Sequence, residues 1–152
     1  MTENFLTATQ IYNHSRLFME AYSTVMRPLC EEAGLPQTAI DILLFLANNP
    51  AHTTARDISR YRNMKPAIIS FHVERLVSEQ YLERREVPGD RRKCSLVCTE
   101  RALGIIEKGR AVQNRFAAQL TSGLSAEELA LYKRCLSTFA QNLEHMKLEG
   151  LT

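Results

Sequence analysis

The sequence lacks the features that would place the chain in a membrane or in an oxidising compartment. Its longest apolar run, Ile42 to Ala47, is far shorter than the roughly 20 residues that a membrane-spanning helix requires. The first residues, Met1 to Asn4, carry no basic segment typical of a secretion signal. The cysteines (Cys30, Cys94, Cys98 and Cys135) are scattered and form no C-x-x-C pair. We therefore expect a cytoplasmic protein with free thiols and no membrane contact.

Patterns of catalysis and of metal binding are missing as well. The sequence shows no nucleophile–base constellation, no phosphate-binding loop and no pair of histidines four residues apart. We therefore expect neither an enzyme nor a metal site, and no cofactor is predicted. A liganded metal or cofactor in the purified protein would reopen the possibility of an enzyme.

The charge is nearly balanced over the whole chain but not along it. The 152 residues are 45% hydrophobic and 24% charged, which is ordinary for one globular domain with a core. The net charge is only +2. Between Arg56 and Lys93, however, ten Lys and Arg face six Asp and Glu, whereas the rest of the chain is net acidic. A basic centre between acidic flanks favours nucleic acid as the partner of the centre.

The basic centre, residues 56–93, begins with the pattern of a helix-turn-helix. Thr54 and Asp57 form a capping-box pattern at the start of a first helix. A polar break follows, in which Asn63 tolerates a left-handed backbone. The second helix is predicted from about Lys65 to Gln80, with Pro66 in its first turn, where a missing N–H costs nothing.

The second helix has one apolar face and one face suited to a DNA groove. Its inward positions, spaced by three and four, are Ile69, His72, Val73 and Leu76. We expect His72 to be a residue under this helix with its polar atoms satisfied. The opposite face is mostly small or polar near the helix start, which lets a backbone approach base edges. Its predicted base or phosphate contacts are Lys65, Pro66, Ala67, Ser70 and Phe71. For Phe71, a thymine-methyl contact and packing against the following hairpin remain equal alternatives.

A β-hairpin is predicted after this helix. Residues 81–87 and 91–98 have strand character, and Pro88-Gly89-Asp90 marks the turn between them. The tip carries three consecutive cations, Arg91, Arg92 and Lys93, which suit phosphates or a narrow minor groove, although a solvated turn would look the same. Arg75 and Arg84 are expected to meet phosphates. Residues 51–53 are expected to add a short strand to this wing.

The spacing of these residues resembles that of the MarR family of transcriptional regulators. The resemblance is carried by Thr54-x-x-Asp57-Ile58-Ser59, Ser70-x-x-x-Glu74-Arg75-Leu76, Arg84, Asp90-Arg91-Arg92 and Thr99. It implies a winged helix-turn-helix in which Asp90 organises the wing by ion pairing with its arginines. Gln80 stands where the family usually has glycine, so we expect this helix to be closed differently. Cys98 stands where leucine is common.

Long helices with apolar seams are predicted at both ends. Residues of about 5–33 form one helix, which Pro28 is expected to kink or end early, and Gly34 fits its C-cap. Residues of about 99–148 form two more, the second opened by a capping box at Ser125 and Glu128. The predicted fold is therefore mainly α with a small β-wing. It forms a single MarR-like domain over residues 1–152, in which a winged helix-turn-helix core at about 36–99 is flanked by dimerisation helices.

The sequence thus predicts a homodimeric, sequence-specific DNA-binding transcriptional regulator, usually a repressor, on a pseudo-palindromic site in double-stranded DNA. The seams could instead close a monomeric core, and the winged helix could be a protein-interaction module without DNA binding. By resemblance, a small aromatic or phenolic effector or an oxidant modulates binding. Candidate effector residues are Tyr12, Arg16, Phe45 and His72, and ordinary core and surface positions are the alternative.

Overall fold

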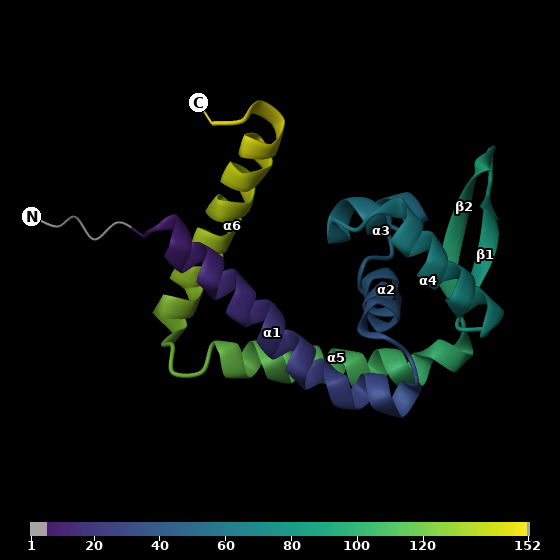
Figure 1. The fold of residues 1–152 in the computed structure, drawn as a ribbon, viewed down its shortest axis with the longest axis horizontal. Helices are drawn as coiled ribbons and strands as arrows, with labels where there is room; N and C mark the ends of the chain where they lie inside the picture. The colour runs from purple at the N-terminus through teal and green to yellow at the C-terminus, as the bar shows by residue number, and fades with distance from the viewer. Residues whose placement is uncertain (1–5, 152) are drawn as a thin grey trace, which may run out of the picture. The chain divides into compact units, whose positions relative to one another are not determined.

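The computed structural model describes residues 6–151 and divides the chain into two compact units, residues 1–114 and 115–152. The first unit holds the winged helix-turn-helix. The elements are α1 (Ala8–Ala33), α2 (Gln37–Asn48), α3 (Ala55–Arg62), α4 (Pro66–Ser78), β1 (Leu82–Val87), β2 (Asp90–Cys98), α5 (Glu100–Leu120) and α6 (Ala126–Glu149). The predicted fold class, mainly α with a small β-wing, is confirmed (Figure 1). The organisation as a single domain, and the dimerisation role of the terminal helices, stay predictions.

Helix α1 is closed at both ends by local hydrogen bonds. Thr7 and Gln10 form a capping box at its start, and Gly34 follows it in the left-handed conformation with φ of 63°. The predicted start at Phe5 lies outside the described residues. Pro28 lies inside the helix, which continues to Ala33, so the prediction of an early end is wrong. Burial of Met26 and Leu29, on either side of Pro28, stabilises the helix across the missing hydrogen bond.

Helix α2 forms the centre of the core in the first unit. Eight consecutive residues, from Ala39 to Leu46, are buried, because α1, α3, α4 and β2 all contact this helix (Figure 1). A helix that is apolar all round can be stable only when neighbours cover every side. Inward residues of α4 and α5, including Ile69, Leu76 and Ile106, complete the same core.

One charged residue interrupts this apolar surface. Asp41 is only 7% exposed and accepts hydrogen bonds from Tyr22 Oη (3.3 Å) and Gln37 Nε2 (3.5 Å). Arg62 of α3 adds an ion pair at 3.2 Å. Burial raises the pKa of the Asp41 carboxyl above its ordinary value, and the charge of Arg62 opposes that rise. A buried carboxylate needs such partners, so this group joins α1, α2 and α3 through one side chain.

The local rules that predict α3 and α4 are borne out. Thr54 and Asp57 form the predicted capping box, Asn63 closes α3 with φ of 50°, and Pro66 occupies the first turn of α4. The end of α4 differs from the expectation. Gln80 adopts the left-handed conformation with φ of 64°.

The hydrogen bonds that close α4 are those usually made at a helix end where glycine takes the left-handed conformation. The Gln80 N–H donates to the Val77 carbonyl over 3.0 Å, and the Tyr81 N–H donates to the Leu76 carbonyl over 2.8 Å. These two bonds form a Schellman motif. The prediction that α4 is closed differently is therefore wrong: the closure is kept, with a non-glycine residue in the left-handed position.

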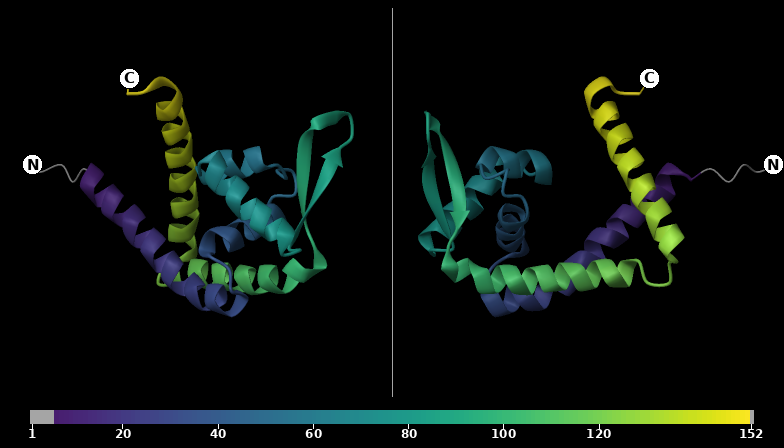
Figure 2. Two further views of the ribbon diagram at one scale, coloured as in Figure 1. Left: turned by 45° about the vertical axis from the view of Figure 1, so that its right-hand side comes forward. Right: turned by 180° about the vertical axis from the view of Figure 1, so that it is seen from behind.

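The wing is a two-stranded antiparallel hairpin in which Leu82 pairs with Cys98 and Val87 with Asp90. Its turn contains Gly89 with φ of 86°. Figure 2 shows the hairpin projecting from the base of α4. Within the described residues, the segment before α3 contributes one backbone bond to it, from the Leu96 N–H to the Thr53 carbonyl (2.8 Å), and not the predicted third strand.

Helix α6 in the second unit opens with the predicted capping box of Ser125 and Glu128 and has no buried residue. Across residues 6–151, no helix is both long and apolar enough to span a bilayer.

Candidate nucleic-acid interface

The first turns of α4 present the residues that the sequence assigned to a DNA groove. Ile69, Val73 and Leu76 are buried against the core. This orientation turns the opposite face outward. The predicted contact residues Lys65, Pro66, Ala67, Ser70 and Phe71 are all exposed there, as is Ile68. The small side chains at Ala67 and Ser70 leave room for a close approach of this helix to another surface.

A shallow hollow beside this face contains two cations that the sequence analysis did not select. It has a volume of about 490 Å³ and is lined by Ala55, Arg56, Ser59, Arg60, Pro66 and Ser70. Arg56 and Arg60 are exposed and come from α3, the helix that precedes α4. Their positions in the basic centre could have identified them, since both belong to the excess of Lys and Arg that begins at Arg56.

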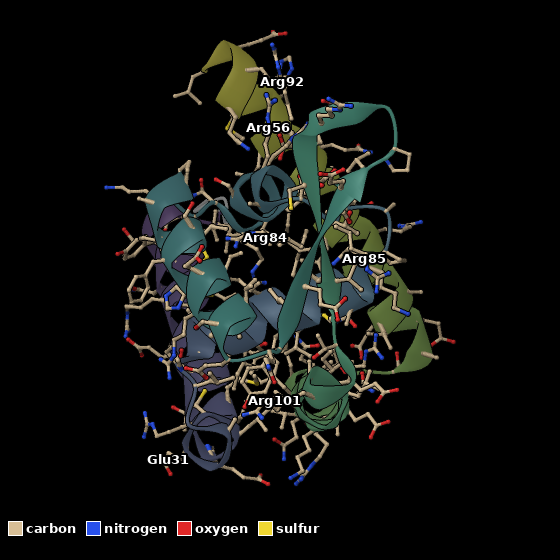
Figure 3. All side chains as sticks on the ribbon, turned by 90° about the vertical axis from the view of Figure 1, so that its right-hand side faces the viewer. Glu31, Arg56, Arg84, Arg85, Arg92 and Arg101 are labelled. Carbon is tan, nitrogen blue, oxygen red and sulfur yellow. The ribbon has the colours of Figure 1, made fainter. Side chains whose placement is uncertain are left out.

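The wing tip carries its cations into solvent. Arg91, Arg92 and Lys93 are all exposed, and Figure 3 shows Arg56 and Arg92 toward the same end of the first unit. Asp90 accepts a hydrogen bond from the backbone N–H of Arg92 (3.0 Å) and lies 3.9 Å from Lys93 Nζ. It therefore holds the main chain of the tip. The expected ion pairing of Asp90 with the wing arginines is replaced by a pair with the lysine.

Arg75 and Arg84, predicted to meet phosphates, both have partners within the chain. Arg75 Nε donates to Glu79 (2.7 Å), and its Nη2 donates to the Gly34 carbonyl (3.1 Å). Arg84 Nη2 donates to Glu74 Oε2 over 2.7 Å, which joins the wing to α4. In Figure 3, Arg84 points toward α4 and Arg85 points away from it. The phosphate contacts of these residues stay predictions, with the added condition that their guanidinium groups must share or leave these partners.

Phe71 is largely exposed at the start of α4. Its side chain is 67% exposed, and its ring lies edge-on to that of His72, with centroids 5.2 Å apart. His72 is half-buried, but its Nδ1 is buried without a hydrogen-bond partner among the described residues. The expectation that His72 has its polar atoms satisfied is therefore wrong for this atom. Burial lowers the pKa of His72, and the charge of Arg75 lowers it further, so the neutral imidazole is favoured.

The four candidate effector residues have different surroundings. Tyr12 is exposed on α1, and Arg16 forms an ion pair with Glu20 (2.7 Å) on the same helix. Phe45 is buried on α2, with the ring of Tyr61 at 6.0 Å between centroids. His72 lies on α4 beside Phe71. A pocket shared by these residues stays a prediction.

Cys30 and Cys98 are partly buried, whereas Cys94 is exposed. Burial raises the pKa of Cys30 and of Cys98, which favours the thiol over the reactive thiolate. Among residues 6–151, no three His, Cys, Asp or Glu side chains gather as a metal site would require.

Comparison with known proteins agrees with this geometry. Residues 33–93, which span α2 to the wing tip, match the model of the MarR family. The uncharacterized HTH-type transcriptional regulator YdgJ of Bacillus subtilis is 24% identical over 114 residues, covering 75% of this chain and 69% of that protein. The predicted resemblance to MarR-family regulators is confirmed.

Solved structures share the fold over nearly the whole chain. The transcriptional regulator PA3341 has a TM-score of 0.77 at 25% identity, covering 90% of this chain and 97% of the other. MepR of S. aureus, solved as a complex with DNA, has a TM-score of 0.74 at 18% identity, covering 93% and 99%.

Proposed function

We propose that this chain, whose winged helix-turn-helix is that of the MarR-family transcriptional regulators, is a homodimeric, sequence-specific DNA-binding regulator that usually represses. One observation carries the proposal: the small and polar start of α4 and the three cations of the wing tip are all exposed. A protein-interaction module would not need three adjacent cations, Arg91, Arg92 and Lys93, at the tip of the wing.

The shape and charge of α4, the wing and α3 suit different parts of a DNA duplex. The start of α4, with Ala67, Ser70 and Phe71, enters the major groove and contacts base edges. The wing tip places Arg91 and Arg92 beside phosphates or in the adjacent minor groove. The two cations of α3, Arg56 and Arg60, extend the positive surface beside the start of α4.

Dimerisation is supported by apolar side chains that the single chain leaves exposed. On α1 these include Ile11, Leu17 and Met19, and on α6 they include Leu136, Phe139, Leu143 and Met146. Those of α6 follow the spacing of three and four residues typical of a helix–helix seam. Burial of such seams by a second copy removes apolar area from water, at about 25 cal/mol per Å². A two-fold dimer then places the α4 helices of its two subunits about 34 Å apart, so that they meet successive major-groove turns of a palindromic site.

A small aromatic or phenolic effector that favours one separation of the two α4 helices would shift the dimer between a DNA-bound and a DNA-free state. The raised pKa values of Cys30 and Cys98 favour such a ligand over oxidation of these two thiols.

Selection of genomic fragments by the purified protein, followed by sequencing, tests the function. We expect enrichment of near-palindromic sites, and sedimentation as a dimer. In a fluorescence titration on a selected site, Arg92→Ala should weaken binding and reduce the slope of log K against log salt by about 0.9 per subunit. Arg27→Ala, which removes an exposed cation from α1, is the matched control and should leave the slope unchanged. Failure to enrich any duplex would overturn DNA binding, and sedimentation as a monomer would overturn the dimer.

A further inference from the structure

The reading face of α4 carries one large apolar side chain that the core does not use. Phe71 is 67% exposed, whereas Ile69 and Val73, on the opposite face, are buried. One helical turn before it lie Ala67, which is small, and Ile68, which is itself exposed, and the Phe71 ring remains largely in solvent beside them. An exposed phenyl ring on this face is available for an apolar contact with a binding partner.

The orientation of this ring is defined by its neighbour. Phe71 and His72 meet edge-on, with an interplanar angle of 82°. Such edge-to-face pairs are favourable for aromatic rings, so His72 limits the directions in which Phe71 can turn. The ring is therefore presented outward from α4 in a restricted orientation.

The charge on this face is also neutralised. Glu74 follows Phe71 by one turn and would repel phosphates if it were free. Its carboxylate accepts a hydrogen bond from Arg84 over 2.7 Å, so the acidic charge has a cation at contact distance. The wing thereby removes the main electrostatic obstacle to bringing Phe71 close to DNA.

We infer that Phe71 reads the C5-methyl group of a thymine in the major groove, an inference that rests on the proposed function. A phenyl ring can neither donate nor accept a conventional hydrogen bond. Among the groups that base pairs present in the major groove, the thymine methyl is the one that an apolar side chain recognises. The structure favours this over packing against the wing, because the ring is exposed and its observed partner is His72.

The test removes the methyl group and nothing else. A duplex selected by the wild-type protein from a random library is resynthesised with each thymine replaced in turn by deoxyuridine, which keeps every hydrogen-bonding group. We expect one replacement per half-site to weaken wild-type binding about fourfold, the value of one buried carbon. Phe71→Ala should bind the thymine and the uracil duplexes equally at that position.

A second variant separates this role from a general loss of apolar surface. Ile68→Ala removes a different exposed apolar side chain of α4, one turn before Phe71, and it should keep the wild-type sensitivity to uracil. Thermal melting checks that both variants are folded. The inference is overturned if the wild type shows no sensitivity at any thymine, or if Phe71→Ala keeps the same sensitive position, while the proposed function stands. If no duplex is selected at all, the proposed function fails and the inference fails with it.

Discussion

Arg84 of the wing donates to Glu74 of the reading helix over 2.7 Å, although ten residues separate them in the sequence. Glu74 is an exposed acidic residue in a region otherwise rich in cations. The pair lowers the pKa of Glu74, chiefly through the hydrogen bond from Arg84, so the carboxylate stays ionised and bound to its partner. One consequence is that the Arg84 guanidinium group stays paired with Glu74 unless a phosphate displaces the carboxylate.

Glu74→Gln should therefore strengthen DNA binding and steepen its salt dependence. The substitution removes a negative charge and releases Arg84, which can then contact a phosphate and add about 0.9 to the slope of log K against log salt. Fluorescence anisotropy over a salt series measures both effects. Glu83→Gln is the matched control, since it frees Arg85, which points away from α4 in Figure 3. Equal slopes for Glu74→Gln and Glu83→Gln would contradict this role of the pair.

Gln80→Gly should stabilise the protein. A residue with a Cβ in the left-handed conformation costs about 1–2 kcal/mol, and the greater flexibility of unfolded glycine cancels part of the gain. We expect a net increase of about 0.5–1 kcal/mol in the free energy of unfolding, measured with urea. Gln80→Ala keeps the Cβ and should give no such gain. The explanation fails if the two variants are equally stable.

Two glycines of α5 should respond to alanine in opposite directions. Gly104 has no atom within 4 Å of the place its Cβ would occupy, so Gly104→Ala should stabilise the helix by about 1 kcal/mol. At Gly109 a Cβ would lie 2.8 Å from Leu44 Cδ2, and Leu44 is itself buried. Overpacking of this kind costs about 1–3 kcal/mol, so Gly109→Ala should fall below the wild type in thermal melting. Similar stabilisation by both substitutions would show that Leu44 moves aside freely.

The stability of the protein should decrease in mild acid because of His72. Its folded-state pKa is lowered below the ordinary value of 6.5, mainly by burial and then by Arg75. The unfolded chain therefore binds a proton more readily than the folded protein does. Protonation of this residue leaves the free energy of unfolding unchanged well above about pH 6.5 and lowers it as the pH falls below that value. Urea unfolding at a series of pH values measures the slope. His72→Leu has no titrating group at this position and should show a shallower decline, and an unchanged slope would exclude His72 as its source.

Local sequence patterns were sufficient for the ends of most helices. Thr54 with Asp57, Ser125 with Glu128, and Asn63 were correctly predicted as caps, because each acts on backbone groups within a few residues. The spacing of apolar residues also predicted which face of α4 is buried, and turn residues located the wing. The exposed start of α4 and the cations at the wing tip follow from these two facts.

Only the tertiary structure decided how side chains distant in the sequence pair. The bond between Glu74 and Arg84, the ion pair of Asp41 with Arg62, and the approach of Gly109 to Leu44 join elements whose relative placement no local pattern specifies. The left-handed Gln80 has the same origin, since the Thr99 hydroxyl donates to its carbonyl over 2.6 Å and helps to hold the turn after α4. Short-range hydrogen bonding sets where elements begin and end, whereas the partners of exposed charges depend on which faces the packed core brings together.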